Sequence, residues 1–386
     1  MKRTIFIGIV LALIKVQTVF SQEQSYDQLA RHYFHKVWNY YRVPQYGLFA
    51  EFYPQAHTDT LTYLQQGGTS KVASYLWPLS GIVSACNRMI KLPGGSQFLP
   101  YLDSAMMAME QYRDTLRHPP GYQAYPARFE KVDRYYDDNG LVAIDYAEAY
   151  LSTGNPVYLK RAKDVFRFIL SGWSDDMGGG VSWLEGHRDQ KPACSNGMAT
   201  LAALKLYSAT KERYYLNWGK KFYNWMKCLR QPPGIYANDI KTKDSSINKT
   251  YYTYNSGSML EASVLLYQFT SDTSYLNEAR TIAQATLAHF GKKQADGRIV
   301  ILDLPWFVTV LFRGYEALYH IDKNSRYIQI IRSNIDYACK HGRDKYGLFN
   351  TSWTNSKDEY EKPKWLLDEA CMVELFARLA LLEGKQ

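Results

Sequence analysis

The stretch "YLSTGNPVYLKRA", Tyr150 to Ala162, ends one helical pattern at a tyrosine, passes through a short polar turn and begins a second helix at Tyr158. The same form recurs in three later stretches, with tyrosine pairs at Tyr207/Tyr215, Tyr267/Tyr275 and Tyr319/Tyr327. The four stretches begin 52 to 60 residues apart. Self-similarity at such a period indicates a repeat of helical hairpins that stack on one another.

Apolar residues spaced by three and four predict four further helices. They cover residues 26–41, 71–90, 98–112 and 365–382. Together with two helices from each of the four hairpins they make twelve, which is the number in an all-α (α/α)6 barrel of six hairpins. In such a barrel the loops at the N-terminal ends of the inner helices form a cleft. A linear helical solenoid is the alternative, because a repeat alone does not prove closure.

The first residues, "MKRTIFIGIVLALIKVQTVFSQ", have a basic start followed by a short apolar stretch, and they predict a signal peptide over residues 1–21. The apolar part is shorter than the roughly 20 residues that a spanning helix needs. No cysteine stands at the expected cleavage point, so we expect export without a membrane anchor. The periplasm is the predicted location and secretion is the alternative. No Pro/Gly/Ser-rich linker divides residues 22–386, which predicts a single catalytic domain.

Charge and cysteine usage exclude several function classes. The formal net charge of the whole chain is +9, and it falls to +6 without residues 1–21, which hold three basic residues and no acid. The lysines and arginines are scattered, so we expect no nucleic-acid partner. The five cysteines lie far apart and no HExxH pattern occurs, which predicts neither a disulfide framework nor a metal site. We therefore expect no metal and no cofactor.

Two adjacent acids, Asp137 and Asp138, stand in "RYYDDNG" directly before a helical pattern. One of them could cap that helix, which is worth about 1 kcal/mol, but a cap needs only one acid. Hydrolysis of a glycosidic bond needs two carboxyls, roughly 5 to 5.5 Å apart for retention and roughly 6.5 to 9.5 Å apart for inversion. Neighbouring Cα atoms lie about 3.8 Å apart, which favours the retaining distance. Proximity of like charges would raise one pKa and keep that carboxyl protonated as the acid.

Three long connections between the predicted hairpins are rich in Gly, Trp and Tyr, and they cover residues 176–187, 230–257 and 291–307. Long loops of this kind on a helical scaffold are usually functional. Their aromatic side chains could stack on sugar rings. The candidates are Trp183, Tyr236, Tyr252, Tyr254 and Trp306. A second acid pair, Asp175 and Asp176, precedes three glycines and indicates a turn or cap, with contact to sugar hydroxyls as the alternative.

The segments "RYYDDNGLVAIDYAEAY", "MGGGVSW", "SNGMATLAALKLY", "GIYAND" and "YTYNSG" occur in an order and spacing that resemble glycoside hydrolase family 76, the endo-α-1,6-mannanases. The resemblance covers roughly residues 75–338. It implies an (α/α)6 barrel and metal-free, retaining hydrolysis of the α-1,6-linked mannan backbone. It further implies that Asp137 is the nucleophile and Asp138 the general acid/base.

The resemblance also extends to substrate contacts. Asn196, Tyr254 and Asn255 match cleft-lining motifs of the family, and Asp239 falls where the family often has a further aspartate against the substrate. Together with the aromatic candidates, the predicted substrate-binding residues are Tyr136, Trp183, Asn196, Asp239, Tyr254, Asn255 and Trp306.

Two other functions use the same residue types. An exported glycan-binding protein would use the aromatic side chains without a nucleophile, and a transglycosylase would share the covalent intermediate and differ only in its acceptor. We expect a monomer whose partner is a mannan polysaccharide or oligosaccharide. Whether attack is internal or at chain ends stays open at this point.

Overall fold

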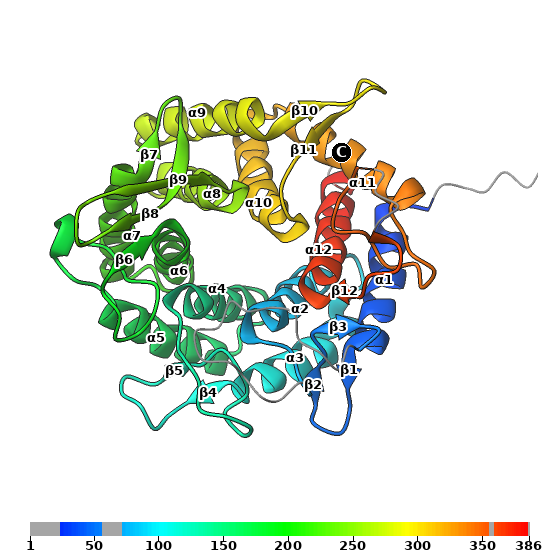
Figure 1. Ribbon diagram of the computed structural model, residues 1–386, viewed down its shortest axis with the longest axis horizontal. Coiled ribbons are helices and arrows are strands. Elements are labelled where there is room, and N and C mark those ends of the chain that lie inside the picture. The colour runs from blue at the N-terminus through cyan, green and yellow to red at the C-terminus, as the bar shows by residue number, and fades with distance from the viewer. Residues whose placement is uncertain (1–23, 56–71, 355–358, 385–386) are drawn as a thin grey trace, which may run out of the picture.

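The computed structural model describes residues 24–55, 72–354 and 359–384. Twelve α-helices run through these residues and form two concentric rings (Figure 1). The inner ring consists of α2 (Leu76–Met89), α4 (Tyr136–Thr153), α6 (Ala193–Thr210), α8 (Thr253–Thr270), α10 (Pro305–Asp322) and α12 (Leu366–Glu383). The outer ring consists of α1 (Tyr26–Tyr41), α3 (Leu99–Glu110), α5 (Pro156–Ser171), α7 (Arg213–Met226), α9 (Thr273–Phe290) and α11 (Arg326–His341).

The inner ring closes on itself. Each inner helix contacts the next one around the ring, and α12 contacts α2. The sixth hairpin is formed by the two ends of the chain, because α1 packs against α12. The prediction of an (α/α)6 barrel is therefore confirmed, and the alternative of a linear solenoid is wrong.

A shared hydrogen bond explains the repeated turn between the two helices of a hairpin. The carbonyl oxygen of the first tyrosine accepts the N–H of the residue four positions later, at 2.8 to 2.9 Å. That residue has a left-handed backbone, which ends the helix. It is Gly154, Lys211, Ser271 or Lys323, with φ between 57° and 70°. Only one of the four is glycine, so the tyrosine spacing marks this turn better than a glycine does.

Glycines let neighbouring inner helices approach closely. A Cβ atom on Gly140 would lie 2.5 Å from the Cβ atom of Met198 on α6. A Cβ atom on Gly257 would lie 2.6 Å from the Cα atom of Leu311 on α10. Any side chain at these positions would push the ring apart. The glycines in "DDNG" and "YNSG" therefore serve the packing of the barrel.

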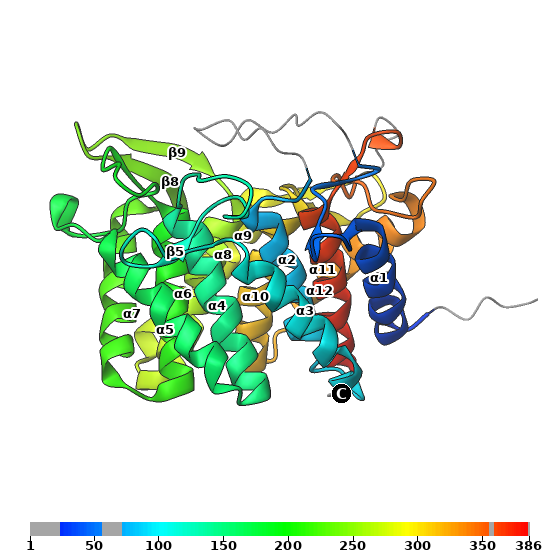
Figure 2. The ribbon, with the colours of Figure 1, turned by 90° about the horizontal axis from the view of Figure 1, so that it is seen from below.

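Short antiparallel strands gather at one end of the barrel, before the inner helices begin (Figure 2). Most are two or three residues long: β1 (Arg42–Val43), β2 (Leu48–Phe49), β3 (Phe52–Tyr53), β4 (Arg113–Asp114), β5 (Gly121–Tyr122), β6 (Gln190–Pro192), β7 (Arg230–Gln231), β10 (Gly291–Lys293), β11 (Ile299–Ile301) and β12 (Lys364–Trp365). The two longer ones are β8 (Ile235–Lys241), which pairs with β6 and β7, and β9 (Ile247–Tyr251), which pairs with β8. The sequence predicted only a loop here. Because β8 is buried at five of its seven positions, it lacks the alternation that reveals a strand.

The four helix ranges predicted from apolar spacing agree with the structure to within two residues, except at α2, whereas the first helix of each repeated hairpin runs three residues past its tyrosine. The pattern placed the start of α2 at residue 71, whereas the helix begins at Leu76. The predicted signal peptide lies outside the described residues. None of the helices that the structure describes has the length and apolar character needed to cross a bilayer.

Candidate active site

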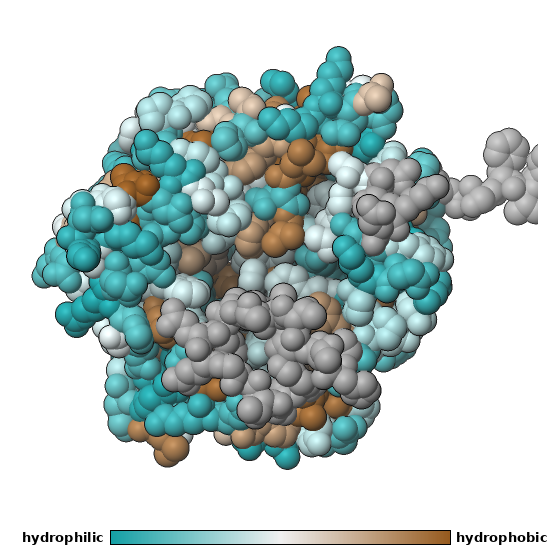
Figure 3. All heavy atoms as spheres, in the orientation of Figure 1, coloured by the Kyte–Doolittle hydropathy of each residue, from teal (hydrophilic) through white to brown (hydrophobic). Residues whose placement is uncertain are grey.

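The end of the barrel that carries the strands holds a main cleft with about 1350 Å³ of empty space, open to solvent. Figure 3 looks onto this end and shows a hollow near its centre, with hydrophobic atoms gathered where β11 and the start of α10 lie. The cleft is lined by Trp77, Asp137, Asp138, Leu141, Trp183, Gln190, Pro192, Cys194, Met198, Asn238, Asp239, Lys241, Asn248, Tyr252, Tyr254, Leu304, Trp306 and Phe307.

The floor of the main cleft follows the rotational repeat of the barrel. Five inner helices contribute their second residue to it: Trp77, Asp137, Cys194, Tyr254 and Trp306. These residues are far apart in the sequence, and they meet because all inner helices begin at the same level around one axis. The second residue of these helices therefore has the same place in the barrel, although its residue type differs from helix to helix.

Asp137 and Asp138 lie in the first turn of α4, after the N-cap residue Tyr135. The side chain of Tyr135 makes no capping hydrogen bond. The backbone N–H of Asp138 donates a hydrogen bond to Oδ1 of Asp137 at 3.1 Å, and the indole N–H of Trp183 donates to Oδ2 at 3.1 Å. Neither acid is therefore the N-cap residue, although Asp137 accepts one backbone N–H of the first turn. Both carboxyls face the cleft.

Burial raises the pKa of both carboxyls, but the two are not equivalent. For Asp137, hydrogen bonds from the Cys194 thiol, the backbone of Asp138 and the indole of Trp183 favour the charged form and offset part of the increase in its pKa. For Asp138, the negative charge of Asp137 adds to burial and holds its pKa well above the usual range. Among the described residues, no lysine or arginine forms an ion pair with either acid. The pair therefore favours a carboxylate at Asp137 and a protonated carboxyl at Asp138.

An aromatic band, formed by Trp77, Tyr252, Tyr254, Trp306 and Phe307, lines one side of the main cleft. The ring centroids of Tyr254 and Phe307 lie 4.2 Å apart. Trp77 meets Trp306 edge to face with 5.4 Å between centroids. Rings packed in this way are rigid and offer broad apolar faces to a ligand.

Strands β6, β8 and β9 form a polar wall of the main cleft. It consists of Gln190, Asn238, Asp239, Lys241 and Asn248. The buried carboxylate of Asp239 accepts hydrogen bonds from the side-chain amides of Asn238 and Asn248, both at 2.9 Å. The ammonium of Lys241 lies 3.3 Å from the other oxygen of Asp239. The wall therefore offers hydrogen-bonding groups in fixed positions.

A side cavity of about 440 Å³ adjoins the main cleft. It shares Trp77, Asp137, Asp138 and Trp183 with the main cleft and adds Tyr75, Ala124 and Tyr135. The two carboxyls therefore lie where the two hollows meet.

The structure brings Trp183, Asp239, Tyr254 and Trp306 to the cleft beside the acid pair, as the sequence predicted, but three other predicted substrate contacts lie behind its walls. The ring of Tyr136 stacks on Phe168 with 4.9 Å between centroids. Asn196 and Asn255 are fully buried in the barrel.

Asn196 has a structural role that explains its place in the "SNG" motif. Its side-chain oxygen accepts the N–H of Val181 at 2.7 Å, and its amide donates to the carbonyl of Val181 at 2.9 Å. Asn139 of "DDNG" holds Tyr122 in the same way, with its oxygen 2.7 Å from the Tyr122 nitrogen. Both asparagines are the fourth residue of an inner helix, where an amide can fasten the preceding strand or loop. The asparagines of these two motifs therefore have a role in packing the barrel.

Sequence reasoning did not single out eleven of the lining residues as site residues: Trp77, Leu141, Gln190, Pro192, Cys194, Met198, Asn238, Lys241, Asn248, Leu304 and Phe307. Trp77 and Cys194 could have been found by aligning the second positions of the inner helices. Tyr236, an aromatic candidate, is buried in the core. Asp175 lies in an exposed turn, where it accepts the indole N–H of Trp173 at 3.0 Å.

The fold and site thus define an (α/α)6 barrel whose cleft holds two adjacent carboxyls between aromatic rings. Residues 25–385 match the model of glycosyl hydrolase family 76, and the chain belongs to this family. This confirms the family that the motifs predicted.

Several known proteins are similar to this chain. A family 76 glycoside hydrolase (mannosidase) from Bacteroides thetaiotaomicron is 27% identical, with a TM-score of 0.83 over 93% of this chain and 99% of that one. An α-1,6-mannanase from a Salegentibacter species is 22% identical, with a TM-score of 0.76 over 93% of this chain and 100% of that one, a likeness of fold alone. That structure is an inactive variant, with two consecutive aspartates replaced by alanine, in complex with α-1,6-mannotetraose.

Curated relatives match over shorter stretches. A putative mannan endo-1,6-α-mannosidase of Schizosaccharomyces pombe is 25% identical over 232 residues, which are 56% of this chain and 50% of that protein. The chain thus spans about half the length of this relative.

Proposed function

We propose that this protein is a retaining, endo-acting glycoside hydrolase that cleaves the α-1,6-linked backbone of mannan without a metal ion. Asp137 is the nucleophile and Asp138 the general acid/base. The observation that carries the proposal is the unequal pair of carboxyls at the junction of two hollows. The family and the substrate of the Salegentibacter enzyme support the choice of mannan.

In the first step, the protonated carboxyl of Asp138 donates its proton to the glycosidic oxygen. The carboxylate of Asp137 attacks the anomeric carbon, the bond to the leaving sugar breaks, and a covalent glycosyl-enzyme forms. The raised pKa of Asp138 suits this step because the acid must still hold its proton at neutral pH.

In the second step, the carboxylate of Asp138 takes a proton from water, and the resulting hydroxide attacks the anomeric carbon and frees Asp137. Esterification removes the negative charge of Asp137, which is one cause of the raised pKa of Asp138. The pKa of Asp138 therefore falls when it must act as a base. Two inversions at one carbon give net retention.

The two hollows support internal cleavage. A chain that occupies both the main cleft and the side cavity places the scissile bond above the acid pair, with sugars on both sides. The aromatic band offers faces for the C–H surfaces of sugar rings, and Asp239 in the polar wall offers hydrogen bonds to hydroxyls.

Export to the periplasm, with secretion as the alternative, remains a prediction from residues 1–21. The single domain over residues 22–386 and the monomeric state are also predictions. Size-exclusion chromatography with light scattering on the purified protein measures the oligomeric state directly.

The test uses protein without residues 1–21 and debranched α-1,6-mannan. We expect a ladder of oligosaccharides early in the reaction by chromatography, and the α-anomer as the first product by NMR. Release of mannose alone would contradict endo action, and the β-anomer would contradict retention. A total lack of release, with binding to mannan retained, would favour a glycan-binding protein. In a parallel reaction with α-1,6-mannotetraose, products longer than the tetrasaccharide would favour a transglycosylase.

A further inference from the structure

Trp183 makes two contacts with the first turn of α4. Its indole N–H donates a hydrogen bond to Oδ2 of Asp137 at 3.1 Å. Its carbonyl oxygen accepts the backbone N–H of Tyr136 at 2.9 Å. Both the side chain and the backbone of Trp183 therefore contact the turn that carries Asp137. These two contacts restrict the movement of Trp183 relative to that turn.

The carboxylate of Asp137 has a donor on each oxygen. Oδ1 accepts the backbone N–H of Asp138, which belongs to the same turn, and Oδ2 accepts the indole of Trp183. The first contact alone would let the carboxylate rotate about its bond to Cβ. The Trp183 contact and a hydrogen bond from the Cys194 thiol together set the plane of the carboxylate, and both donors come from other segments of the chain.

The segment that carries Trp183 is held in place by the barrel. The buried ammonium of Lys191 donates to the carbonyls of Ser174, Asp176 and Gly179. The amide of Asn196 binds both polar backbone groups of Val181, two residues before Trp183. The indole N–H of Trp225 on α7 donates to the carbonyl of Met177 at 3.1 Å.

Glycine is required in this segment. Gly179 and Gly180 have φ values of 123° and 91°, which other residues rarely adopt. A Cβ atom on either one would lie 2.4 Å from a tryptophan ring, that of Trp173 or Trp225. The motif "MGGGVSW" therefore builds a tightly packed support that ends at the indole of Trp183.

We propose that Trp183 is a positioning residue, whose indole N–H orients the carboxylate of Asp137 for attack on the anomeric carbon. The inference rests on the proposed function, in which Asp137 is the nucleophile. It replaces the role in sugar stacking that the sequence predicted for Trp183. The loop from Gly178 to Trp183 then serves the reaction through Asp137.

Replacement of Trp183 by phenylalanine tests this role, because an aromatic ring remains and only the N–H and the outer ring are lost. We expect kcat to fall about 10- to 100-fold, less than the roughly 100- to 1000-fold loss for a donor that contacts the reacting atoms, with KM changed less than about threefold. The acid limb of the pH profile of kcat/KM should move to higher pH, because the hydrogen bond from Trp183 favours ionised Asp137. An unchanged pH profile with a raised KM would overturn the proposal.

The matched control is Trp306→Phe, the same chemical change in the aromatic band of the same cleft. It should raise KM and leave the pH profile where it is in the parent. An equal shift of the profile in both variants would show a general effect of cleft aromatics and would also overturn the proposal.

Substrate binding measured in the slow Asp138→Asn variant separates a positioning role of Trp183 from a stacking role. Trp183→Phe in the Asp138→Asn variant should bind α-1,6-mannotetraose within about threefold of Asp138→Asn itself by calorimetry, whereas a smaller ring in a stacked contact would weaken binding by about fivefold or more. Weaker binding than that overturns the proposal, provided that circular dichroism shows a folded variant. Asp137→Asn is measured in parallel: if it is active, the proposed function fails, and if it is inactive while the Trp183→Phe profile is unchanged, only the role of Trp183 fails.

Discussion

The inner helices hold acids in opposite electrostatic settings at the cleft and farther along their length. At the cleft end, burial raises the pKa of Asp137 and Asp138. Deeper along the same ring of helices, Glu148, Glu316 and Glu374 are buried, but their pKa values are lowered, to about 2 for Glu316 and Glu374. Asp137 and Asp138 are only half-buried, whereas these glutamates are buried, so burial alone does not decide the protonation state.

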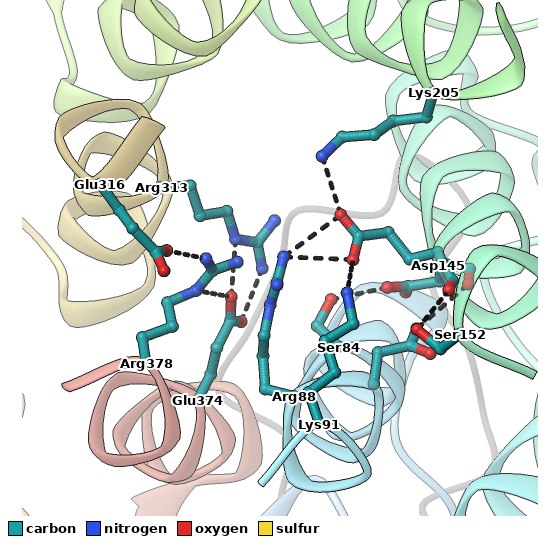
Figure 4. A network of polar contacts seen from close by, with 12 residues as sticks. Ser84, Arg88, Lys91, Asp145, Ser152, Lys205, Arg313, Glu316, Glu374 and Arg378 are labelled. Carbon is teal, nitrogen blue, oxygen red and sulfur yellow. Dashed lines mark hydrogen bonds and ion pairs between the residues drawn. The ribbon is translucent and has the colours of Figure 1, made fainter. Parts of the chain in front are cut away.

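The difference lies in the neighbouring cations, which form a charged network inside the ring (Figure 4). Arg313 binds Glu374 through two hydrogen bonds, at 2.8 and 2.7 Å, and Arg378 binds both Glu374 and Glu316. Lys205 lies 2.8 Å from Glu148 and 2.7 Å from Glu261. Every inner helix contributes to the network: Arg88, Glu148, Lys205, Glu261, Arg313 and Glu374 come from α2, α4, α6, α8, α10 and α12.

The comparison shows that the same ring of helices holds acids with a structural role and acids with a proposed catalytic role. Acids that face a guanidinium or an ammonium stay ionised and join helices to one another. Among the residues that the structure describes, the acids at the cleft have only neutral donors and each other, so the raised pKa of Asp138 lets it hold a proton.

The largest expected effect is that of Asp137→Asn. The amide cannot form the glycosyl-enzyme, so we expect activity on α-1,6-mannan to fall by about four orders of magnitude or more, with an unchanged thermal midpoint. Initial rates of reducing-sugar release measure it. Asp175→Asn, in an exposed turn, is the control and should retain activity within about twofold. Comparable rates in Asp137→Asn and the parent would remove the nucleophile from our mechanism.

Asp138→Asn should lose about 10²- to 10⁴-fold on mannan, because the leaving sugar then departs without a proton. The loss should be much smaller on an aryl mannooligosaccharide with an acidic phenol, which needs no protonation to leave. Steady-state rates on the two substrates give the comparison. An equal loss on both would mean that Asp138 is not the acid.

Glu374→Ala tests the other side of the comparison. It leaves Arg313 and Arg378 buried with one partner fewer, so we expect a loss of about 3 to 5 kcal/mol in the free energy of unfolding, measured by urea denaturation. The exposed pair of Lys160 and Asp164 is the control, and Lys160→Ala should cost about 1 kcal/mol or less. The pH profile of the folded variant should match the parent, since Glu374 does not line the cleft.

The smallest expected effect concerns the pH dependence of stability. The pKa of Glu374 is lowered to about 2, so its stabilisation is present above the unfolded value near 4.5 and is lost as the pH falls toward 2.

Asp145 behaves in the opposite way, because burial outweighs its hydrogen bond from Ser84 and raises its pKa to about 8. The folded state then binds the extra proton, and this contribution to stability declines as the pH rises from about 4 to 8.

Asp145→Asn should therefore flatten the decline between pH 4 and 8 without changing the acid side. Thermal midpoints of the parent and the variant across pH 3 to 9 measure this. Parallel curves for the two proteins would show that Asp145 does not couple folding to protons in this range.

The sequence by itself determined the helical hairpins and the acid pair, because their signals are local, whereas closure of the predicted barrel was shown only by the contact of α12 with α2. The turn depends on a hydrogen bond between residues four positions apart, and Asp137 and Asp138 are neighbours in the chain. The family followed from motifs in a fixed order, and the match over residues 25–385 agrees with it.

Only the tertiary structure decided which residues surround the acids. Trp183 reaches Asp137 from 46 positions away, and Cys194 reaches it from the next inner helix. Asn196 and Asn255 belong to motifs that predicted a cleft, yet both are buried. The spacing of residues in the sequence does not show that an asparagine fastens a loop to a helix. The charged network likewise exists only once the ring closes and brings six distant positions to one axis.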